Sequence, residues 1–226
     1  MMKSIDQPGV REREGLSAAV LAGGKSQRMG SDKALMSLVA GGPALLSLVL
    51  ARLETVSNDV FIVANDYDRY DQFGYRVVAD VHADAGPLGG IHSAVSKARQ
   101  QHTLVVACDM PFLNRGLLQR MAEEPRDYDV LVPEIPGESR QGRGEMVYQT
   151  LHAIYGRTCQ SVIEERIASG ARQVMGLFED VQVRTIDLSE VLHFDPELLS
   201  FFNANTPEAL HAASKIVAGE GRLTGE

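Results

Sequence analysis

The chain has 226 residues, of which 44% are hydrophobic, enough for one globular domain with a substantial core. Its net charge of −8 makes the surface as a whole repel nucleic acid and anionic membranes, so phosphate groups would have to bind in a local cationic pocket. Cys108 and Cys159 have no metal-ligand spacing, which favours a reducing cytoplasm over a disulfide framework.

Nothing in the sequence indicates a membrane or secretory segment. No apolar run approaches the ~20 residues that a membrane-spanning helix needs. The charged N-terminal residues lack the hydrophobic region of a secretory signal. We expect a single domain over residues 16–218, with flexible tails at 1–15 and 219–226.

The first half of the chain alternates short apolar runs with helical patterns. Near-continuous apolar runs are typical of parallel strands that helices bury on both faces. The sequence therefore predicts an α/β fold with a mostly parallel central sheet in three layers, α/β/α. Strands are expected at residues 16–22, 59–65, 75–80, 103–109 and 128–134, and helices at 43–57, 87–100 and 114–124.

After Val132 the pattern is less regular. We expect a loop at 133–145, one long or broken strand at 146–155, a helix at 158–170 that Gly170 ends, and a strand at 181–187. The last helix is well signalled, since Thr206 suits the N-cap, Pro207 the first helical position and Gly219 the end. His92, His152 and Cys159 are interpreted as helix or core residues.

Ligands of open parallel sheets bind beyond the carboxyl ends of the strands. Four residues fall at or just after such ends: Gly23, Asn65, Asp80 and Asp109. They are therefore the first candidates for a binding site.

The segment after the first strand is both glycine-rich and basic. Gly23 and Gly24 allow successive backbone amides to point at an anion, and Arg28 and Lys33 add positive charge. The segment is not a P-loop, because Ala19 stands where that motif requires glycine. The Rossmann glycine pattern also fails, since Gly23 and Gly24 are adjacent. An ordinary loop with solvated cations remains the alternative.

Asp109 ends an apolar strand in the segment ACDMPFL, where a carboxylate is costly unless it is paired or binds a cation. Mg²⁺ prefers one or two carboxylates together with phosphate oxygens and water. The alternative is a cap or turn residue before the next helix.

Two further segments carry candidate nucleotide contacts. In the stretch from Asp80 to Ala94, Gly86, Gly89 and Gly90 allow a base or ribose to approach the backbone, although helix–sheet packing explains small residues equally well. The Asn65 amide offers a donor and an acceptor to a base edge, or it is a turn residue.

The pattern L-A-G-G-x-S-x-R-M-G-x-D-K resembles the signature of the molybdenum cofactor guanylyltransferases, a family of MobA-like nucleotidyltransferases. Later segments resemble the same family in the same order: CDMP around Asp109, GPLGGI from Gly86, and NANTPEAL from Asn203. The signature is matched by Leu21, Ala22, Gly23, Gly24, Ser26, Arg28, Met29, Gly30, Asp32 and Lys33.

The resemblance implies a Rossmann-like nucleotidyltransferase fold, with a nucleotide-binding part at about 16–132 and an acceptor-binding part at about 133–218. It implies that GMP is transferred from GTP to molybdenum-molybdopterin, with Mg²⁺ as cofactor and pyrophosphate as leaving group. Arg28, Lys33 and Asp109 would be catalytic, and Asp109 and Asn205 would hold the metal. Nucleotide contacts are implied for Leu21, Ala22, Gly23, Gly24, Lys33, Asn65, Asp80, Gly86, Gly89 and Asp109.

The chain departs from the family pattern in two places. Gly89 stands where the family has alanine, and Thr150 stands where it usually has proline. The second departure lies in the acceptor half, where Arg140 and Arg143 are either contacts for the pterin phosphate or solvated loop residues.

Other activities on this fold remain open. They are a molybdopterin cytidylyltransferase, a sugar-1-phosphate nucleotidyltransferase, and a non-catalytic molybdopterin carrier. For the guanylyltransferase, the resemblance implies transient contact with molybdenum-insertion proteins and molybdoenzyme chaperones, and we expect a monomer or weak homo-oligomer.

Overall fold

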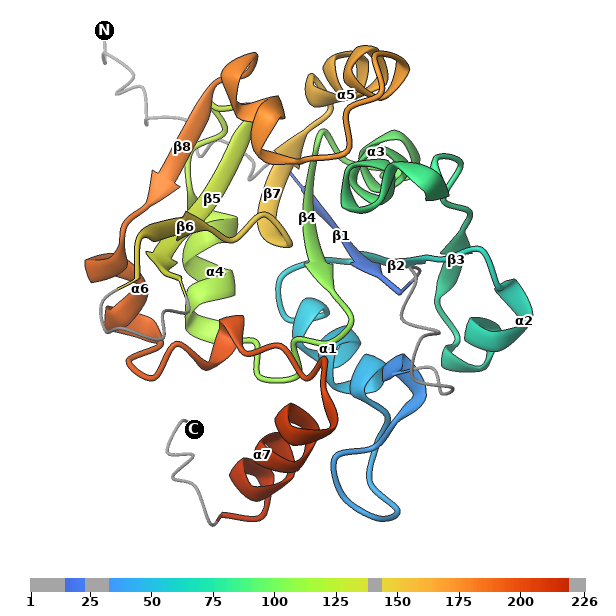
Figure 1. Cartoon of the computed structure of the whole chain (residues 1–226), viewed down its shortest axis with the longest axis vertical. Coiled ribbons are helices and arrows are strands. Elements are labelled where there is room, and N and C mark those ends of the chain that lie inside the picture. Colours follow the sequence, from blue (N-terminus) through green and yellow to red (C-terminus); the bar gives the residue numbers. More distant parts are fainter. Residues whose placement is uncertain (1–14, 23–32, 138–143, 220–226) are drawn as a thin grey trace, which may run out of the picture.

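The computed structural model describes residues 15–22, 33–137 and 144–219. A single mixed sheet forms its centre (Figure 1). The strands are β1 (Leu16–Leu21), β2 (Asp59–Val63), β3 (Arg76–Val78), β4 (His102–Ala107), β5 (Val130–Pro136), β6 (Met146–Tyr148), β7 (His152–Gly156) and β8 (Val183–Ile186).

The strand order is β3-β2-β1-β4-β7-β5-β6, and β8 pairs with β5. The pairs among β3, β2, β1 and β4 are parallel, whereas β7 runs antiparallel to both β4 and β5. The mostly parallel sheet predicted from the sequence is confirmed. The carboxyl ends of its first four strands meet at one edge of the sheet.

Helices cover both faces of this sheet. In Figure 1, α3 and α5 lie side by side over one face, and α1, α4 and α6 lie on the other. The helices are α1 (Leu45–Leu53), α2 (Tyr67–Tyr70), α3 (Pro87–Lys97), α4 (Arg115–Glu123), α5 (Cys159–Ala168), α6 (Leu188–Phe194) and α7 (Pro207–Val217).

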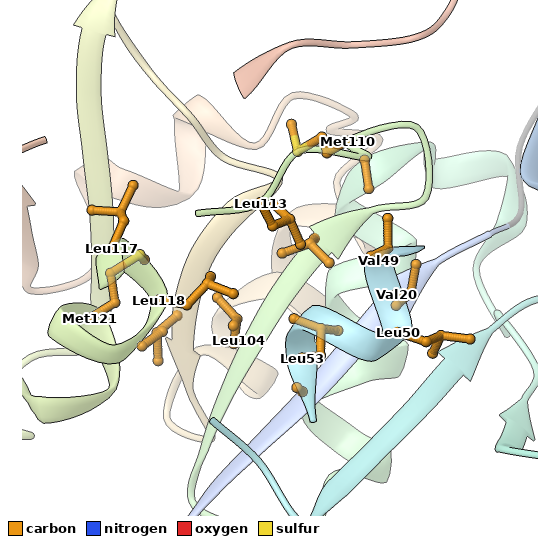
Figure 2. Packing of buried hydrophobic residues seen from close by; sticks show 14 of the residues in the cluster. Val20, Val49, Leu50, Leu53, Leu104, Met110, Leu113, Leu117, Leu118 and Met121 are labelled. Atoms are coloured by element: carbon orange, nitrogen blue, oxygen red, sulfur yellow. The ribbon is translucent and has the colours of Figure 1, made fainter. Parts of the chain in front are cut away.

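The larger apolar core lies between the sheet and helices α1 and α4. Figure 2 shows Leu50 of α1 near Val20 of β1, and Leu118 of α4 near Leu104 of β4, all within one buried cluster. Each side chain at 1% exposure or less contributes about 1.5–3 kcal/mol through burial. Because Met110 and Leu113 also enter this core, the turn after Asp109 is fixed to it.

The alternation within β1 explains how one strand serves two cores. Ala18 and Val20 face the α1 and α4 side, while Ala19 and Leu21 face the α3 and α5 side. All six residues of β1 are buried, as expected for a central strand with helices on both faces.

Several local predictions need correction. The expected helix at 43–57 begins only at Leu45, and the helix expected to reach Gln100 ends at Lys97, where Ala98 turns to extended backbone. Residues 133–136 fell in the expected loop, the first two also in the expected strand at 128–134, but all four belong to β5 because β6 and β8 pair with them. Helices α2 and α6 were not predicted, since each is short.

Within the described ranges, no helix has the length and apolar character needed to cross a bilayer.

The start of β7 carries a fully buried imidazole, that of His152. Neither ring nitrogen hydrogen-bonds to a described group, and the ring packs 4.9 Å from that of Phe201. Burial lowers the pKa of His152 to about 4, and the Ser200 backbone and the Asp195 charge oppose this without overcoming it. The sequence interpretation of His152 as a core residue is confirmed.

This buried imidazole predicts a loss of stability in acid. An unfolded histidine titrates near pH ~6.5, so below that pH the unfolded chain binds a proton that the folded chain excludes. The contribution to the free energy of unfolding therefore falls as pH drops from about 6.5 toward 4, by about 2 kcal/mol between pH 7 and pH 5. His152→Leu should remove that part of the pH dependence in urea unfolding.

A histidine on the exposed surface of α7 provides the control. His211→Leu makes the same substitution at an exposed position and is measured alongside His152→Leu. If His152→Leu and the parent lose the same free energy of unfolding between pH 7 and pH 5, the assignment of a buried, neutral imidazole to His152 is wrong.

Candidate functional site

The carboxyl edge of the parallel strands is tied together by main-chain hydrogen bonds. Ala22 donates to the Val63 carbonyl at 3.0 Å, and Cys108 donates to the Leu21 carbonyl at 3.2 Å. Asn65 and Asp109, which follow β2 and β4, are thus held on either side of the end of β1. Asn65, Asp80 and Asp109, three of the four candidates predicted from the strand ends, therefore share one edge of the sheet.

Lys33, Asp109 and Asn205 come from distant parts of the sequence and meet at this edge. The Lys33 ammonium donates to the Asn205 main-chain carbonyl, and the Ala204 N–H donates to the Asp109 carbonyl at 2.8 Å. The Lys33 charge also acts electrostatically on the Asp109 carboxylate. The Lys33 cation, the Asp109 carboxylate and the Asn205 main chain are therefore gathered where the fold favours a ligand.

Asp109 lies in a poorly solvated position. Burial raises the pKa of its carboxyl group, and its own backbone N–H and the charge of Lys33 oppose that rise. An ionised carboxylate in such a position gains from an added cation. Within the described ranges no group of three or more His, Cys, Asp or Glu side chains is arranged to hold a metal. The donor set instead fits Mg²⁺ that shares its ligands with phosphate oxygens and water.

Asn65 and Asp80 form a second part of the edge. The Asn65 side-chain oxygen accepts from the Asp80 N–H at 2.8 Å. The Asp80 carboxylate in turn accepts from the His82 N–H at 3.0 Å and the Ser93 hydroxyl at 3.2 Å. Both predicted nucleotide contacts therefore fix the loop before α3, and the Asn65 NH₂ group is the part of that amide suited to a base acceptor.

The structure explains the presence of glycine at the three positions of the α3 segment in different ways. Gly86 is the N-cap of α3 at φ 61° and ψ −144°, a conformation that essentially only glycine adopts. A Cβ on Gly89 would lie 2.2 Å from the His82 main-chain oxygen, and one on Gly90 would lie 2.8 Å from a Leu21 methyl carbon. Packing thus accounts for Gly89 and Gly90 without a ligand, while nucleotide contact at Gly86 and Gly89 stays a prediction.

These distances predict different costs for two alanine substitutions in the same helix. Both gain about 1 kcal/mol of helix propensity. Gly89→Ala meets a main-chain oxygen, whereas the Leu21 side chain can move away from Gly90→Ala. Gly89→Ala should therefore be the less stable variant by about 1–3 kcal/mol in denaturant unfolding. Equal stability of the two variants would contradict the close approach of α3 to the His82 loop.

Several predicted site residues are engaged in the fold itself or lie outside the described ranges. Leu21 and Ala22 are buried, and the Ala22 carbonyl accepts from the Tyr70 hydroxyl at 2.7 Å. Sequence reasoning missed Tyr70 and Ser93, which support the edge; no local pattern marks them, because their partners are far away in the sequence. Gly23, Gly24, Arg28, Arg140 and Arg143 lie outside the described residues.

Two surface hollows lie at the opposite, amino-end edge of the parallel strands. The larger, of about 610 Å³, includes His102 and Arg157, and the other, of about 590 Å³, includes Asp59 and Arg99. Asp59 serves the fold there: burial raises its pKa, but hydrogen bonds from the Ser17 hydroxyl and the Arg99 N–H bring it below the ordinary value. We place the functional site at the carboxyl edge, because ligands of such sheets bind there.

His92 and Cys159 also match their sequence interpretation. His92 lies in α3 with 5% exposure and contacts Glu164 of α5 at 2.8 Å. Cys159 begins α5 and is buried, and neither it nor Cys108 forms a disulfide. These groups join α3 to α5 and to the sheet.

Comparison with known proteins agrees with this geometry. A model of the MobA-like NTP transferase domain matches residues 18–184. A probable molybdenum cofactor guanylyltransferase of Pelotomaculum thermopropionicum is 35% identical, covering 92% of this chain and 96% of its own length. The crystal structure of molybdopterin-guanine dinucleotide biosynthesis protein A from Archaeoglobus fulgidus has a TM-score of 0.73 and 27% identity, covering 89% of this chain and 98% of its own.

The fold alone is shared more widely. The 2-C-methyl-D-erythritol 4-phosphate cytidylyltransferase of Thermus thermophilus has a TM-score of 0.65 at 16% identity, covering 88% of this chain and 98% of its own. The fold and the residues gathered at the carboxyl edge of the sheet together define an enzyme of the nucleotidyltransferase class, with a Rossmann-like sheet. Within that class, the chain belongs to the MobA-like NTP transferase domain family.

Proposed function

We propose that this enzyme transfers GMP from GTP to molybdenum-molybdopterin, forming the molybdopterin guanine dinucleotide cofactor and releasing pyrophosphate. The observation that carries the proposal is the meeting of Lys33, Asp109 and Asn205 at the carboxyl edge of the sheet, in a chain of this family. The base and acceptor follow the names of the relatives.

The reaction is an in-line attack of an acceptor phosphate oxygen on the α-phosphorus of GTP. Such transfers depend mainly on positioning and on neutralising charge. Lys33 would stabilise charge that develops on the phosphates, and its contact with the Asn205 carbonyl orients the ammonium. Arg28 and the Gly23–Gly24 backbone are proposed to hold the triphosphate tail.

Mg²⁺ would be held by Asp109 and by the side chain of Asn205. The fit rests on the desolvated carboxylate of Asp109 and on the hydrogen bond from the N–H of Ala204, the neighbour of Asn205, to the Asp109 main-chain carbonyl. When bound, the ion would neutralise phosphate charge. The protein's own part is to fix the two oxygen ligands and to keep Lys33 beside them.

The nucleoside is proposed to lie over the Asn65 and Asp80 side of the edge. The Asn65 NH₂ group would donate to a base acceptor, because its oxygen already accepts from Asp80. Gly86 and Gly89 would border the nucleotide, and Leu21 and Ala22 would approach it at the end of β1. Guanine and cytosine both offer acceptors, so this contact by itself selects neither base.

The acceptor would occupy the half formed by residues 133–218, and the nucleotide the half formed by 16–132. The structural basis is that β5, β6, β7 and β8 build the far side of the sheet from β1, β2 and β3. Arg140 and Arg143 are candidates for the pterin phosphate. The two cysteines form no disulfide, which suits a reducing cytoplasm, where the product would pass to molybdenum-insertion proteins or molybdoenzyme chaperones.

Pyrophosphate release tests the reaction. The purified enzyme with Mg²⁺ and molybdenum-molybdopterin should release pyrophosphate from GTP much faster than from CTP. Preference for CTP would favour a cytidylyltransferase, and turnover with a sugar-1-phosphate acceptor would favour the sugar-1-phosphate nucleotidyltransferase. A carrier would release no pyrophosphate with any nucleotide.

A further inference from the structure

The segment between α6 and α7 contains an unusual backbone conformation. Leu198 has φ 55° and ψ 28°, and among the described residues it alone combines a side chain beyond glycine with positive φ. Such a conformation costs about 1–3 kcal/mol and persists only where its surroundings fix it. Leu198 also precedes a short 3₁₀ helix, η6 (Leu199–Phe201), which it cannot cap with its side chain.

A buried carboxylate provides that cap. Asp195 is 4% exposed, and its two carboxylate oxygens accept from the Leu199 N–H at 3.1 Å and the Ser200 N–H at 2.7 Å. Its main-chain oxygen accepts from the Leu198 N–H at 3.0 Å. A carboxylate buried in this way is costly unless such donors compensate it, so Asp195 and η6 are held together.

A second anchor joins η6 to α4. The fully buried Ser200 hydroxyl accepts from the Asn114 N–H at 2.9 Å. Asn114 caps α4 by accepting from the Leu117 N–H at 3.0 Å, and its NH₂ group donates to the Phe194 carbonyl at 2.8 Å. Because α4 follows the Asp109 turn, η6 is fixed to the same framework as the predicted metal ligand.

The chain passes directly from η6 to the functional edge. Ala204 donates to the Asp109 carbonyl at 2.8 Å, and the Asn205 carbonyl accepts from Lys33. Only Phe202 and Asn203 separate these contacts from η6. The position of η6 therefore sets where Asn205 meets Lys33, and a displacement of about 1 Å at a reacting centre can cost about 10²-fold in rate.

We propose that Asp195, acting through Ser200 and η6, is a positioning residue for nucleotidyl transfer. The inference rests on the proposed function. A cap that served stability alone would lower the fraction of folded protein and leave the chemistry of each folded molecule unchanged. A positioning residue changes kcat per competent site while GTP binding is largely kept.

The test uses Asp195→Asn, which has nearly the same shape, and Ser200→Ala, which removes the bond to Asn114. Calorimetric titration with GTP and Mg²⁺ counts competent sites and gives Kd, and kcat is then expressed per site. We expect kcat to fall about tenfold in Asp195→Asn and severalfold in Ser200→Ala, with KM and Kd within about threefold of the parent. Hydrogen exchange of residues 202–206 should quicken in both.

Asp187→Asn is the matched control, since Asp187 caps α6 by accepting from the Glu190 N–H at 2.9 Å and has no bond to η6. It should leave kcat per site and exchange at 202–206 as in the parent. Parental values in both test variants, or an equal fall in the control, would overturn the role. If Asp195→Asn does not fold, kcat per site of Ser200→Ala alone tests the positioning role. Turnover of the parent enzyme tests the proposed function, whereas the ratio of variant to parent kcat per site tests the role of Asp195.

Discussion

Asp109→Asn should lower nucleotidyl transfer by about 10²–10³-fold while the protein stays folded. The change keeps the side-chain shape and the main-chain carbonyl that accepts from Ala204, but it removes the charge that would hold Mg²⁺. Burial already raises the pKa of this carboxyl group, so the charge is a cost to the fold and its removal should leave the unfolding temperature equal or higher. Steady-state pyrophosphate release and calorimetric unfolding measure the two effects.

The opposite pattern would show that Asp109 is structural. In that case Asp109→Asn would lower the unfolding temperature and keep near-normal turnover. Asp68→Asn, at an exposed position in α2, is the control for the loss of one negative charge and should change neither quantity.

Lys33→Ala should also cost about 10²–10³-fold in kcat/KM, which corresponds to ~3–4 kcal/mol of transition-state stabilisation. The loss has two parts, because Lys33 would carry charge to the phosphates and its ammonium also holds the Asn205 carbonyl. Lys33→Arg should recover only part of the rate, since a planar guanidinium cannot replace a compact ammonium in that contact.

Lys97 at the end of α3 is exposed and offers the matched control, because Lys97→Ala removes the same charge away from the edge. We expect its kcat/KM to equal that of the parent. Near-normal turnover of purified Lys33→Ala would exclude the catalytic role of Lys33.

The elements with local signals could be predicted from the sequence. The apolar run of β1, the helical spacing of α1 and the cap of α7 each lie within one element. Asp109 was identified by a carboxylate at the end of an apolar run, and the glycine-rich pattern identified the family. The edge that these residues share follows from parallel topology.

The parts that were missed depend on contacts between distant residues. Residues 133–136 complete β5 because β6 and β8 pair with them, and these partners lie in other parts of the sequence. Sequence reasoning did not single out Asp195, whose burial follows from η6 folding back over its carboxylate. Tyr70 likewise shows its role only through a bond to Ala22 across the fold.

A crystal structure of the enzyme with GTP and Mg²⁺ would test the location of catalysis most directly. The triphosphate should lie at the carboxyl edge, with its phosphates beside Lys33 and the metal on Asp109, and with the base toward Asn65 and Gly86. A nucleotide bound instead in the hollows near Asp59 or His102, at the other edge of the sheet, would contradict it.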